Sequence, residues 1–501
     1  MSVNRRALLG LGLLSLLSGC ATGPGAGTVL RIAQPADPRT LDPHKISDMP
    51  SMNALINVFD TLTTRGPDNR LAPGLALSWE APDPYTWRFR LRPGVRFHNG
   101  EACDAVAVAF SVNRLLNPAT KSPIVELRNV SAAVPLDELT VELRTSKPDP
   151  IIPAKVSLFG GVVVPPGYLA VAGDAGFARH PVGTGPFTFV DFQRDRRLRL
   201  RANPGYWAGP AGYRDLEFMP MPNTSSALAA LQSDEVDMVT ELSPDSALQI
   251  TGYRGVSIRN YPAVPTSYVS LDTTDGPLSD VRVRRALNHA VDVPLLIKAV
   301  MDGKARELAT LIPRESFGHD PAITPYTRDL DLAKRLLTEA GYPNGFDTTL
   351  TARTDSALLA EAISGLLARA GVRAAVRLLD IGTYTARLTS DNRRALGPMY
   401  LAKSTGWTLD GQSLVQSNVR HDRRQSRWNS PEADRLIDAE ELGIAPEDRQ
   451  RAFTELQRLL KDQAPFVFLF QSDSIYAMGD RAHWQPNAAG VLRMHSATVT
   501  A

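Results

Sequence analysis

The spacing of hydrophobic and polar positions predicts strands and helices that alternate along most of the chain. Val29 to Ala33 reads as a short strand, and Trp87 to Leu91 alternates apolar and basic residues, as in a half-buried strand. Ala105 to Leu116 has helical spacing and follows Asp104, a residue type that caps helix N-termini. The first part of the chain is therefore expected to mix strands with helices.

The second half of the chain is richer in helical patterns. Asp280 can cap a helix over Val281 to Ala290, and a further helix is expected to begin at Pro446. Between the helical segments lie apolar stretches typical of strands, among them Thr348 to Ala352 and Phe466 to Phe470. This alternation predicts an α/β protein with mostly parallel strand pairing.

The N-terminal segment reads as an export signal. Arg5 and Arg6 precede an apolar run over Ala7 to Leu17 that is too short to cross a bilayer, which needs about 20 residues. The run ends in Leu17-Ser18-Gly19-Cys20, which is similar to the lipobox of bacterial lipoproteins. We therefore expect a signal peptide over residues 1–20, a linker over residues 21–27 and a lipid on Cys20. The predicted product is an extracytoplasmic, membrane-anchored lipoprotein, with the general and twin-arginine export routes both open.

Composition limits the classes of function. The chain has 501 residues, 43% of them hydrophobic, and a formal net charge of +2, with no basic stripe that would indicate nucleic acid. With Cys20 acylated, Cys103 has no disulfide partner. The His-Glu-x-x-His, Cys-x-x-Cys and Gly-x-Ser-x-Gly motifs are absent, so we expect no enzyme, no cofactor and no metal site. An extracytoplasmic hydrolase with a triad from distant residues and a sensory lipoprotein remain alternatives.

Several segments, taken in order, resemble one family. They are Leu71 to Ala76, Leu91 to Glu101, Pro181 to Phe187, Asn203 to Trp207 and Asp280 to Leu287. Together they look like the family 5 extracytoplasmic solute-binding proteins, the oligopeptide, dipeptide, glutathione and nickel receptors of ABC transporters. The resemblance extends over almost the whole mature chain.

The resemblance implies an α/β clam-shell of two lobes joined by two hinge crossovers. Lobe I would comprise residues 28–269 and 478–501, with a small subdomain over residues 76–180, and lobe II would comprise residues 270–477. Ligand would bind between the lobes, which close over it by hinge motion. The expected partners are the transmembrane permease subunits of an ABC transporter, and the receptor itself is expected to be a monomer.

The resemblance also implies ligand-binding residues. Peptide-binding members hold the peptide's N-terminal ammonium with an aspartate three residues after a tryptophan, a spacing that Trp407 and Asp410 match. A carboxylate suits this task because an unpaired ammonium in a dry cleft costs several kcal/mol. Trp407 would form an apolar wall. The segment from Gly411 to Leu414 departs from the usual continuation, which has a second acidic residue and a proline.

Dipeptide receptors of this family use an arginine early in lobe II for the ligand carboxylate. Arg353 is the nearest candidate, and Arg387 and Arg427 are alternatives. A guanidinium can bind a carboxylate through two parallel hydrogen bonds. The expected function is a substrate-binding lipoprotein that delivers a short peptide or peptide-like solute to an ABC importer. Glutathione, another amine-bearing solute and a metal chelate are the alternative ligands.

Overall fold

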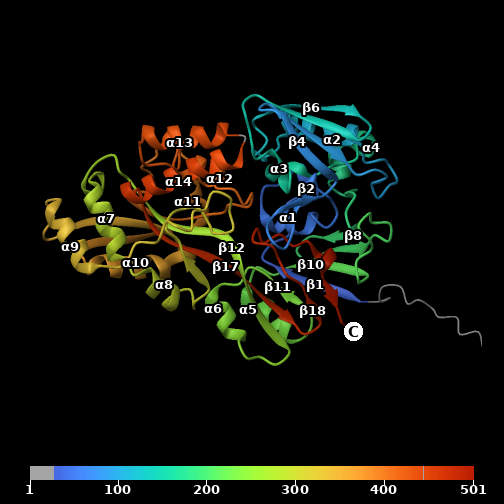
Figure 1. Cartoon of the computed structure of the whole chain (residues 1–501). Helices are drawn as coiled ribbons and strands as arrows, with labels where there is room; N and C mark the ends of the chain where they lie inside the picture. Colours follow the sequence, from blue (N-terminus) through green and yellow to red (C-terminus); the bar gives the residue numbers. More distant parts are fainter. Residues whose placement is uncertain (1–27, 444, 501) are drawn as a thin grey trace, which may run out of the picture.

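One mixed β-sheet runs through the whole molecule. The computed structural model describes residues 28–443 and 445–500. Its sheet has eleven strands in the order β15-β14-β16-β12-β17-β11-β1-β10-β9-β8, with β13 paired to β17 (Figure 1). Two long strands, β12 (Val256–Leu271) and β17 (Phe466–Gly479), occupy the centre of this order and pair with each other. They connect the two ends of the molecule.

Lobe I is the end of the sheet that contains the first strand. Its elements are β1 (Val29–Gln34), β8 (Phe187–Gln193), β9 (Arg197–Ala202), β10 (Asp215–Pro220), β11 (Met238–Val239), α1 (Met49–Leu55), α5 (Thr224–Gln232) and α6 (Pro244–Ile250). The C-terminal segment belongs here too, because Trp484, Leu492 and Met494 lie in the same hydrophobic core as Leu30 and Ile32. The two ends of the chain therefore build one core.

The segment expected to form the subdomain, residues 76–180, contains a separate four-stranded sheet, and its bounds as a subdomain stay a prediction. The elements of this segment are β4 (Ala76–Asp83), β5 (Thr86–Leu91), α2 (Ala105–Leu116), β6 (Val130–Asp137), β7 (Thr140–Thr145), α3 (Ile152–Lys155) and α4 (Pro166–Phe177), of which α4 packs into the core of lobe I. The predicted helix over Ala105 to Leu116 is confirmed, and the Asp104 carboxylate accepts a hydrogen bond from the backbone N–H of Ala107. Cys103 is buried in the core of this segment, and burial raises the pKa of its thiol, which makes it unreactive.

Lobe II carries most of the helices. Its elements are α7 (Val281–Ala290), α8 (Val293–Ala299), β13 (Ala305–Glu307), α9 (Leu330–Glu339), β14 (Phe346–Arg353), α10 (Ala357–Ala368), β15 (Val372–Leu379), α11 (Ile381–Leu388), β16 (Met399–Ser404), α12 (Gln412–Asn418), α13 (Pro431–Leu442) and α14 (Pro446–Gln463). Its hydrophobic cores lie on either side of β12 and β17 and include Val269, Tyr268 and Phe470. Figure 1 shows α12, α13 and α14 together on the side that faces the subdomain.

The prediction of mostly parallel pairing is wrong. Parallel pairing occurs between β1 and its neighbours β10 and β11, and between β14 and its neighbours β15 and β16. The remaining pairs of the large sheet are antiparallel. The reason is that β8, β9 and β10 follow one another as a meander, and β12 and β17 cross between the lobes in opposite directions.

The crossover strands contribute to both lobes. Residues 256–262 of β12 pair with residues 473–479 of β17, and a register shift separates this stretch from residues 266–271, which pair with β16 and with the start of β17. The lobe boundaries expected after residues 269 and 477 fall within these two strands and stay a prediction.

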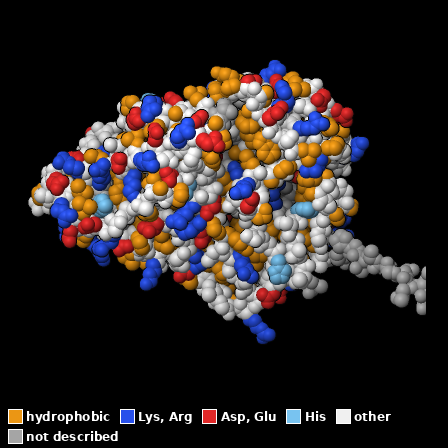
Figure 2. All heavy atoms as spheres, viewed as in Figure 1, with side chains coloured by type: hydrophobic (Ala, Val, Ile, Leu, Met, Phe, Trp, Pro, Cys, Tyr) orange, Lys and Arg blue, Asp and Glu red, His pale blue; other side chains and the backbone are white. Residues whose placement is uncertain are grey.

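The surface shows no dominant sign of charge on the face seen in Figure 2. Acidic and basic side chains are interspersed over both lobes, in agreement with the net charge of +2. Within residues 28–443 and 445–500, none of the helices combines the length and the apolarity needed to cross a membrane.

Candidate functional site

The segment that carries the predicted ammonium site lies between β16 and α12. We call residues 405–411 the interlobe loop. The backbone of Phe317 holds this loop: its N–H donates to the carbonyl oxygen of Leu409, and its carbonyl accepts from the N–H of Gly411, both at 2.9 Å. A side chain at Gly411 would come within 2.9 Å of Ile312 and 3.0 Å of Phe453, so only glycine fits without displacing this core. The loop is therefore packed firmly against lobe II.

The interlobe loop also contacts lobe I. The Trp407 ring packs edge-on against Phe159, with 5.6 Å between the ring centroids. The guanidinium of Arg65, which ends strand β2 (Thr63–Arg65), donates a hydrogen bond to the carbonyl oxygen of Thr408. Trp407 thus lies where the lobes meet, and its role as an apolar wall for the ligand stays a prediction.

Asp410 is buried and ion-paired within lobe II. Its two carboxylate oxygens accept from Arg449 Nη1 at 2.9 Å and from Arg449 Nη2 at 2.8 Å, and Oδ1 also accepts from the N–H of Gln412 at 3.0 Å. The side chains of Asp410 and Arg449 are each only 7% exposed. A carboxylate offers about four acceptor positions, so these three bonds leave one position, on Oδ2.

A second carboxylate joins this ion pair. Glu440 on α13 accepts from Arg449 Nη2 at 3.1 Å, and its side chain is fully buried. Burial, with a smaller contribution from the nearby Asp410 charge, raises the pKa of Glu440 to about 8 even though Arg449 acts in the opposite direction. We call Asp410, Arg449 and Glu440 the buried triad. At neutral pH a large part of Glu440 is protonated, which limits the negative charge of the triad.

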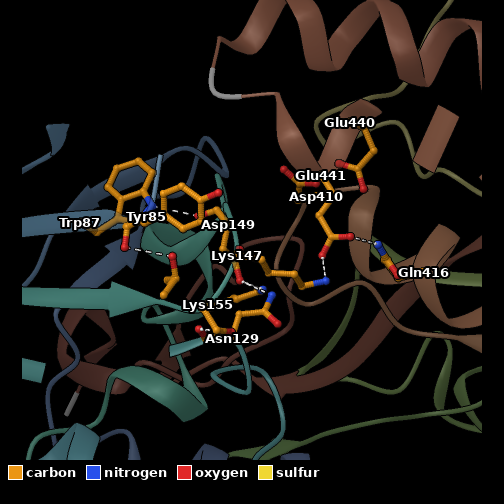
Figure 3. A network of polar contacts seen from close by, with 12 residues as sticks. Tyr85, Trp87, Asn129, Lys147, Asp149, Lys155, Asp410, Gln416, Glu440 and Glu441 are labelled. Carbon is orange, nitrogen blue, oxygen red and sulfur yellow. Dashed lines mark hydrogen bonds and ion pairs between the residues drawn. The ribbon is translucent and has the colours of Figure 1, made fainter. Parts of the chain in front are cut away.

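A polar bridge beside the buried triad connects the subdomain to lobe II. Lys147, just after β7, forms an ion pair with Glu441, and Glu441 also accepts a hydrogen bond from Gln416 at 2.9 Å (Figure 3). Figure 3 shows the Lys147 side chain reaching out from the subdomain toward these two residues. The subdomain, lobe I and lobe II are therefore in contact around the interlobe loop.

The candidate arginines lie apart from Asp410. Arg353 ends β14 and pairs with Asp355, and no contact in the described part of the chain joins it to Trp407 or Asp410. Arg427 donates to the carbonyl oxygen of Gly397 at 2.7 Å and is only 7% exposed, and burial lowers its pKa. The structure thus brings Trp407 and Asp410 together on one loop but leaves Arg353, Arg387 and Arg427 as separate candidates.

Sequence reasoning missed Arg449, Glu440 and Lys147. The sequence did contain an indication that Arg449 is buried. On the helix predicted from Pro446, Arg449 lies four residues before Phe453 and therefore on the same apolar face of that helix. A charged residue on that face needs a buried partner. Which acidic residue pairs with it depends on a fold that brings together residues 39 positions apart.

The described residues contain no group of three or more histidine, cysteine, aspartate or glutamate side chains that could hold a metal ion. Cys20, the signal peptide over residues 1–20 and the linker over residues 21–27 lie outside the described residues.

Comparison with known proteins places the chain among solute-binding proteins. Residues 70–425 match the family described as bacterial extracellular solute-binding proteins, family 5. The glutathione-binding protein GsiB of Pectobacterium atrosepticum is 25% identical over 94% of this chain and 93% of its own length. The dipeptide-binding protein of Escherichia coli K12 is also 25% identical, over 94% of each chain.

Solved structures have the same fold. HbpA2 of Haemophilus parasuis matches with a TM-score of 0.84 and 23% identity over 95% of this chain and all of that one. The periplasmic binding protein DppA of Helicobacter pylori, solved with the peptide STSA, matches with a TM-score of 0.77 and 24% identity over 94% of this chain and 98% of that one. These likenesses confirm the two-lobed binding-protein fold.

Proposed function

Because this chain belongs to family 5 of the bacterial extracellular solute-binding proteins, we propose that it is the receptor of an ABC importer for a short peptide or peptide-like solute. The receptor captures its ligand between the lobes and delivers it to the transmembrane permease subunits. The observation that carries this proposal is the interlobe loop, where Trp407 and Thr408 of lobe II contact Phe159 and Arg65 of lobe I. A solute bound beside this loop is positioned to hold the lobes together.

Asp410 is the proposed partner of the ligand's ammonium. The acceptor position left on its Oδ2 can receive one N–H bond from an ammonium, and Trp407 lies three residues away on the same loop. The pairing with Arg449 offsets part of the negative charge of Asp410, so the attraction for an ammonium is weaker than that of a free carboxylate. Glutathione is the second candidate, because it also carries a free amine and a relative that matches 94% of this chain is named for binding it.

The experiment that tests the ligand class combines mass spectrometry with a substitution. Solutes released by denaturing the purified protein, residues 28–501, are identified first, and free peptides or glutathione are expected.

Asp410→Asn is then expected to weaken binding of the free-amine solute by roughly tenfold, and that of its N-acetylated form by much less, because only the free amine carries the charge that Asp410 binds. Calorimetric titration of both forms measures the difference. An equal loss for both forms would show that Asp410 acts only through the buried triad.

The lipid anchor is a separate part of the proposal. Cys20 follows Leu17-Ser18-Gly19, and the lipid on its side chain would tether the receptor beside its transporter. Cys20→Ser is expected to move the protein from the membrane fraction to the soluble fraction, because no other acylation site is predicted. Fractionation followed by immunoblotting measures this change, with Cys103→Ser as the control that stays in the membrane fraction. Retention of the Cys20→Ser protein in membranes would contradict lipid anchoring at this residue.

A further inference from the structure

A cavity of about 300 Å³ lies within lobe I, next to the interlobe loop. Its walls come from three stretches, residues 56–67, 206–208 and 484–496, and from the two single positions Gly74 and Pro186. Arg65 lines this cavity and also donates to the carbonyl oxygen of Thr408, so the cavity adjoins the place where the lobes meet. We call it the lobe I cavity.

Two arginines in the cavity wall have only neutral partners. Arg493 Nη2 donates to Thr61 Oγ1 at 3.1 Å and to the carbonyl oxygen of Ser157 at 3.3 Å, while its Nε and Nη1 have no hydrogen-bond partner within the described chain. Arg65 donates to the carbonyl oxygens of Asn69 and Thr408, and its buried Nε has no partner among the described residues. The remaining N–H groups are available to a ligand.

Burial lowers the pKa of both arginines, that of Arg65 to about 10, so both remain charged at neutral pH. Both side chains are partly buried, and the carboxylates that act on them, Asp410 on Arg65 and Asp60 on Arg493, offset only part of the desolvation. An anion bound in direct contact would offset more of it. The two guanidinium groups therefore favour an anionic ligand.

The carboxylate in the wall does not form an ion pair with either arginine. Asp60 accepts from the hydroxyls of Tyr206 and Thr184, both at 2.9 Å, and from Trp207 Nε1 at 3.0 Å. Glycines bring the Thr184 segment close enough for this contact: a side chain at Gly183 would lie 2.0 Å from the carbonyl oxygen of Val58. Two guanidinium groups against one carboxylate give the wall a net charge of +1. One monoanionic group would neutralise it.

The other residues of the cavity wall can contact the uncharged part of a small organic ligand. Tyr206, Trp207 and Trp484 provide aromatic surface, and Asn487 Oδ1 is a buried acceptor with no partner in the described chain. The volume is at the lower end of the range for small-ligand sites, so it fits one carboxylate-bearing end of a solute rather than a long peptide.

We propose that the lobe I cavity is an anion subsite that binds the carboxylate of the transported solute through Arg65 and Arg493, while Asn487 accepts an N–H from the same solute. This inference rests on the proposed function and narrows its ligand to small carboxylates. It places the ligand's negative end in lobe I, where Arg65 also contacts the interlobe loop, and not at Arg353, which already pairs with Asp355. A ligand carboxylate bound to Arg65 would then contact the side chain that links lobe I to the interlobe loop.

The test uses a matched pair of probes that differ only in charge, phenylacetate and phenylacetamide. Each is titrated calorimetrically into the purified protein, residues 28–501, at constant ionic strength. Phenylacetate is expected to bind at least roughly tenfold more tightly than phenylacetamide, because only phenylacetate can form charge-assisted hydrogen bonds with the two guanidinium groups. No binding of phenylacetate, or equal binding of the two probes, would overturn the subsite.

Substitutions test whether the preference for phenylacetate over phenylacetamide arises in the lobe I cavity. Arg65→Gln and Arg493→Gln are each expected to abolish the preference for phenylacetate. Arg70→Gln, on the neighbouring turn with an 87% exposed side chain, and Arg353→Gln are expected to retain it. Should Arg493→Gln fail to fold, Arg493→Lys, which keeps the charge but loses the paired N–H geometry, is expected to weaken phenylacetate binding. A preference that survives loss of both Arg65 and Arg493, or that disappears in Arg353→Gln, contradicts the proposal.

The identity of the released solute separates this inference from the proposed function. A released peptide-like solute without an anionic group would leave the receptor function intact and remove the subsite. A released solute that carries a carboxylate but is not peptide-like, together with clear discrimination between the two probes, would support the cavity and count against the peptide receptor.

Discussion

Replacing Arg449 with methionine is expected to lower the free energy of unfolding by about 3–5 kcal/mol. Removal of the guanidinium leaves the Asp410 carboxylate buried without its cationic partner and leaves Glu440 without a hydrogen-bond donor, and breaking a buried ion pair from one side carries a cost of this size. Methionine fills similar space, so the loss reflects charge rather than a cavity. Denaturant unfolding at pH 7 measures it.

The matched control lies two residues further along the same helix. Arg451 pairs with Asp448 on the surface, with a side chain that is 71% exposed. Arg451→Met is expected to change stability by less than about 1 kcal/mol, because water already screens that pair. Similar losses for the Arg449 and Arg451 variants would mean that the buried triad contributes no more than a surface ion pair.

Phe453→Ala is the second substitution with a large expected effect, again about 3–5 kcal/mol of unfolding free energy. Phe453 is fully buried, its ring lies 6.1 Å from that of Phe317, and it packs close to Gly411. Alanine would leave a cavity directly beneath the interlobe loop. The loop should therefore loosen as well, and faster hydrogen exchange of the Gly411 amide, which bonds to Phe317, is the measurement specific to it.

Phe453→Leu serves as the control, because it keeps most of the apolar volume. It should cost clearly less stability and leave the Gly411 amide protected. If Phe453→Ala has the same free energy of unfolding as the wild type, Phe317 and the surrounding helices must move to fill the cavity.

The sequence predicted local structure well wherever one stretch of chain contained the whole signal. The helix over Ala105 to Leu116 has its capping aspartate and its apolar face within one segment, and the structure confirms both bounds. Strand direction was predicted wrongly because it depends on where a strand's partner lies. β12 and β17 pair although about two hundred residues separate them, and no local pattern specifies that they run in opposite directions.

The candidate site was likewise predictable from the sequence only where the signal lay within one short segment. Trp407 and Asp410 could be proposed from one short motif, and the structure places both on one loop between the lobes. The partners of that loop come from distant segments: Arg65 and Phe159 from lobe I, and Arg449 from the last long helix. Their roles depend on tertiary contacts, which the one-dimensional pattern of apolar and polar residues does not encode.

The path of β12 and β17 has a consequence for the order in which an exported chain can fold. The core of lobe II draws on one continuous stretch, from β12 to the first half of β17. The core of lobe I combines the first strand with Tyr476, Met478 and the segment after them. Lobe I, although its synthesis begins first, is therefore completed only when the segment up to Ala497 has been made, and until then its early strands lack part of their core. A chain cut before Tyr476 should retain a compact lobe II and an incomplete lobe I.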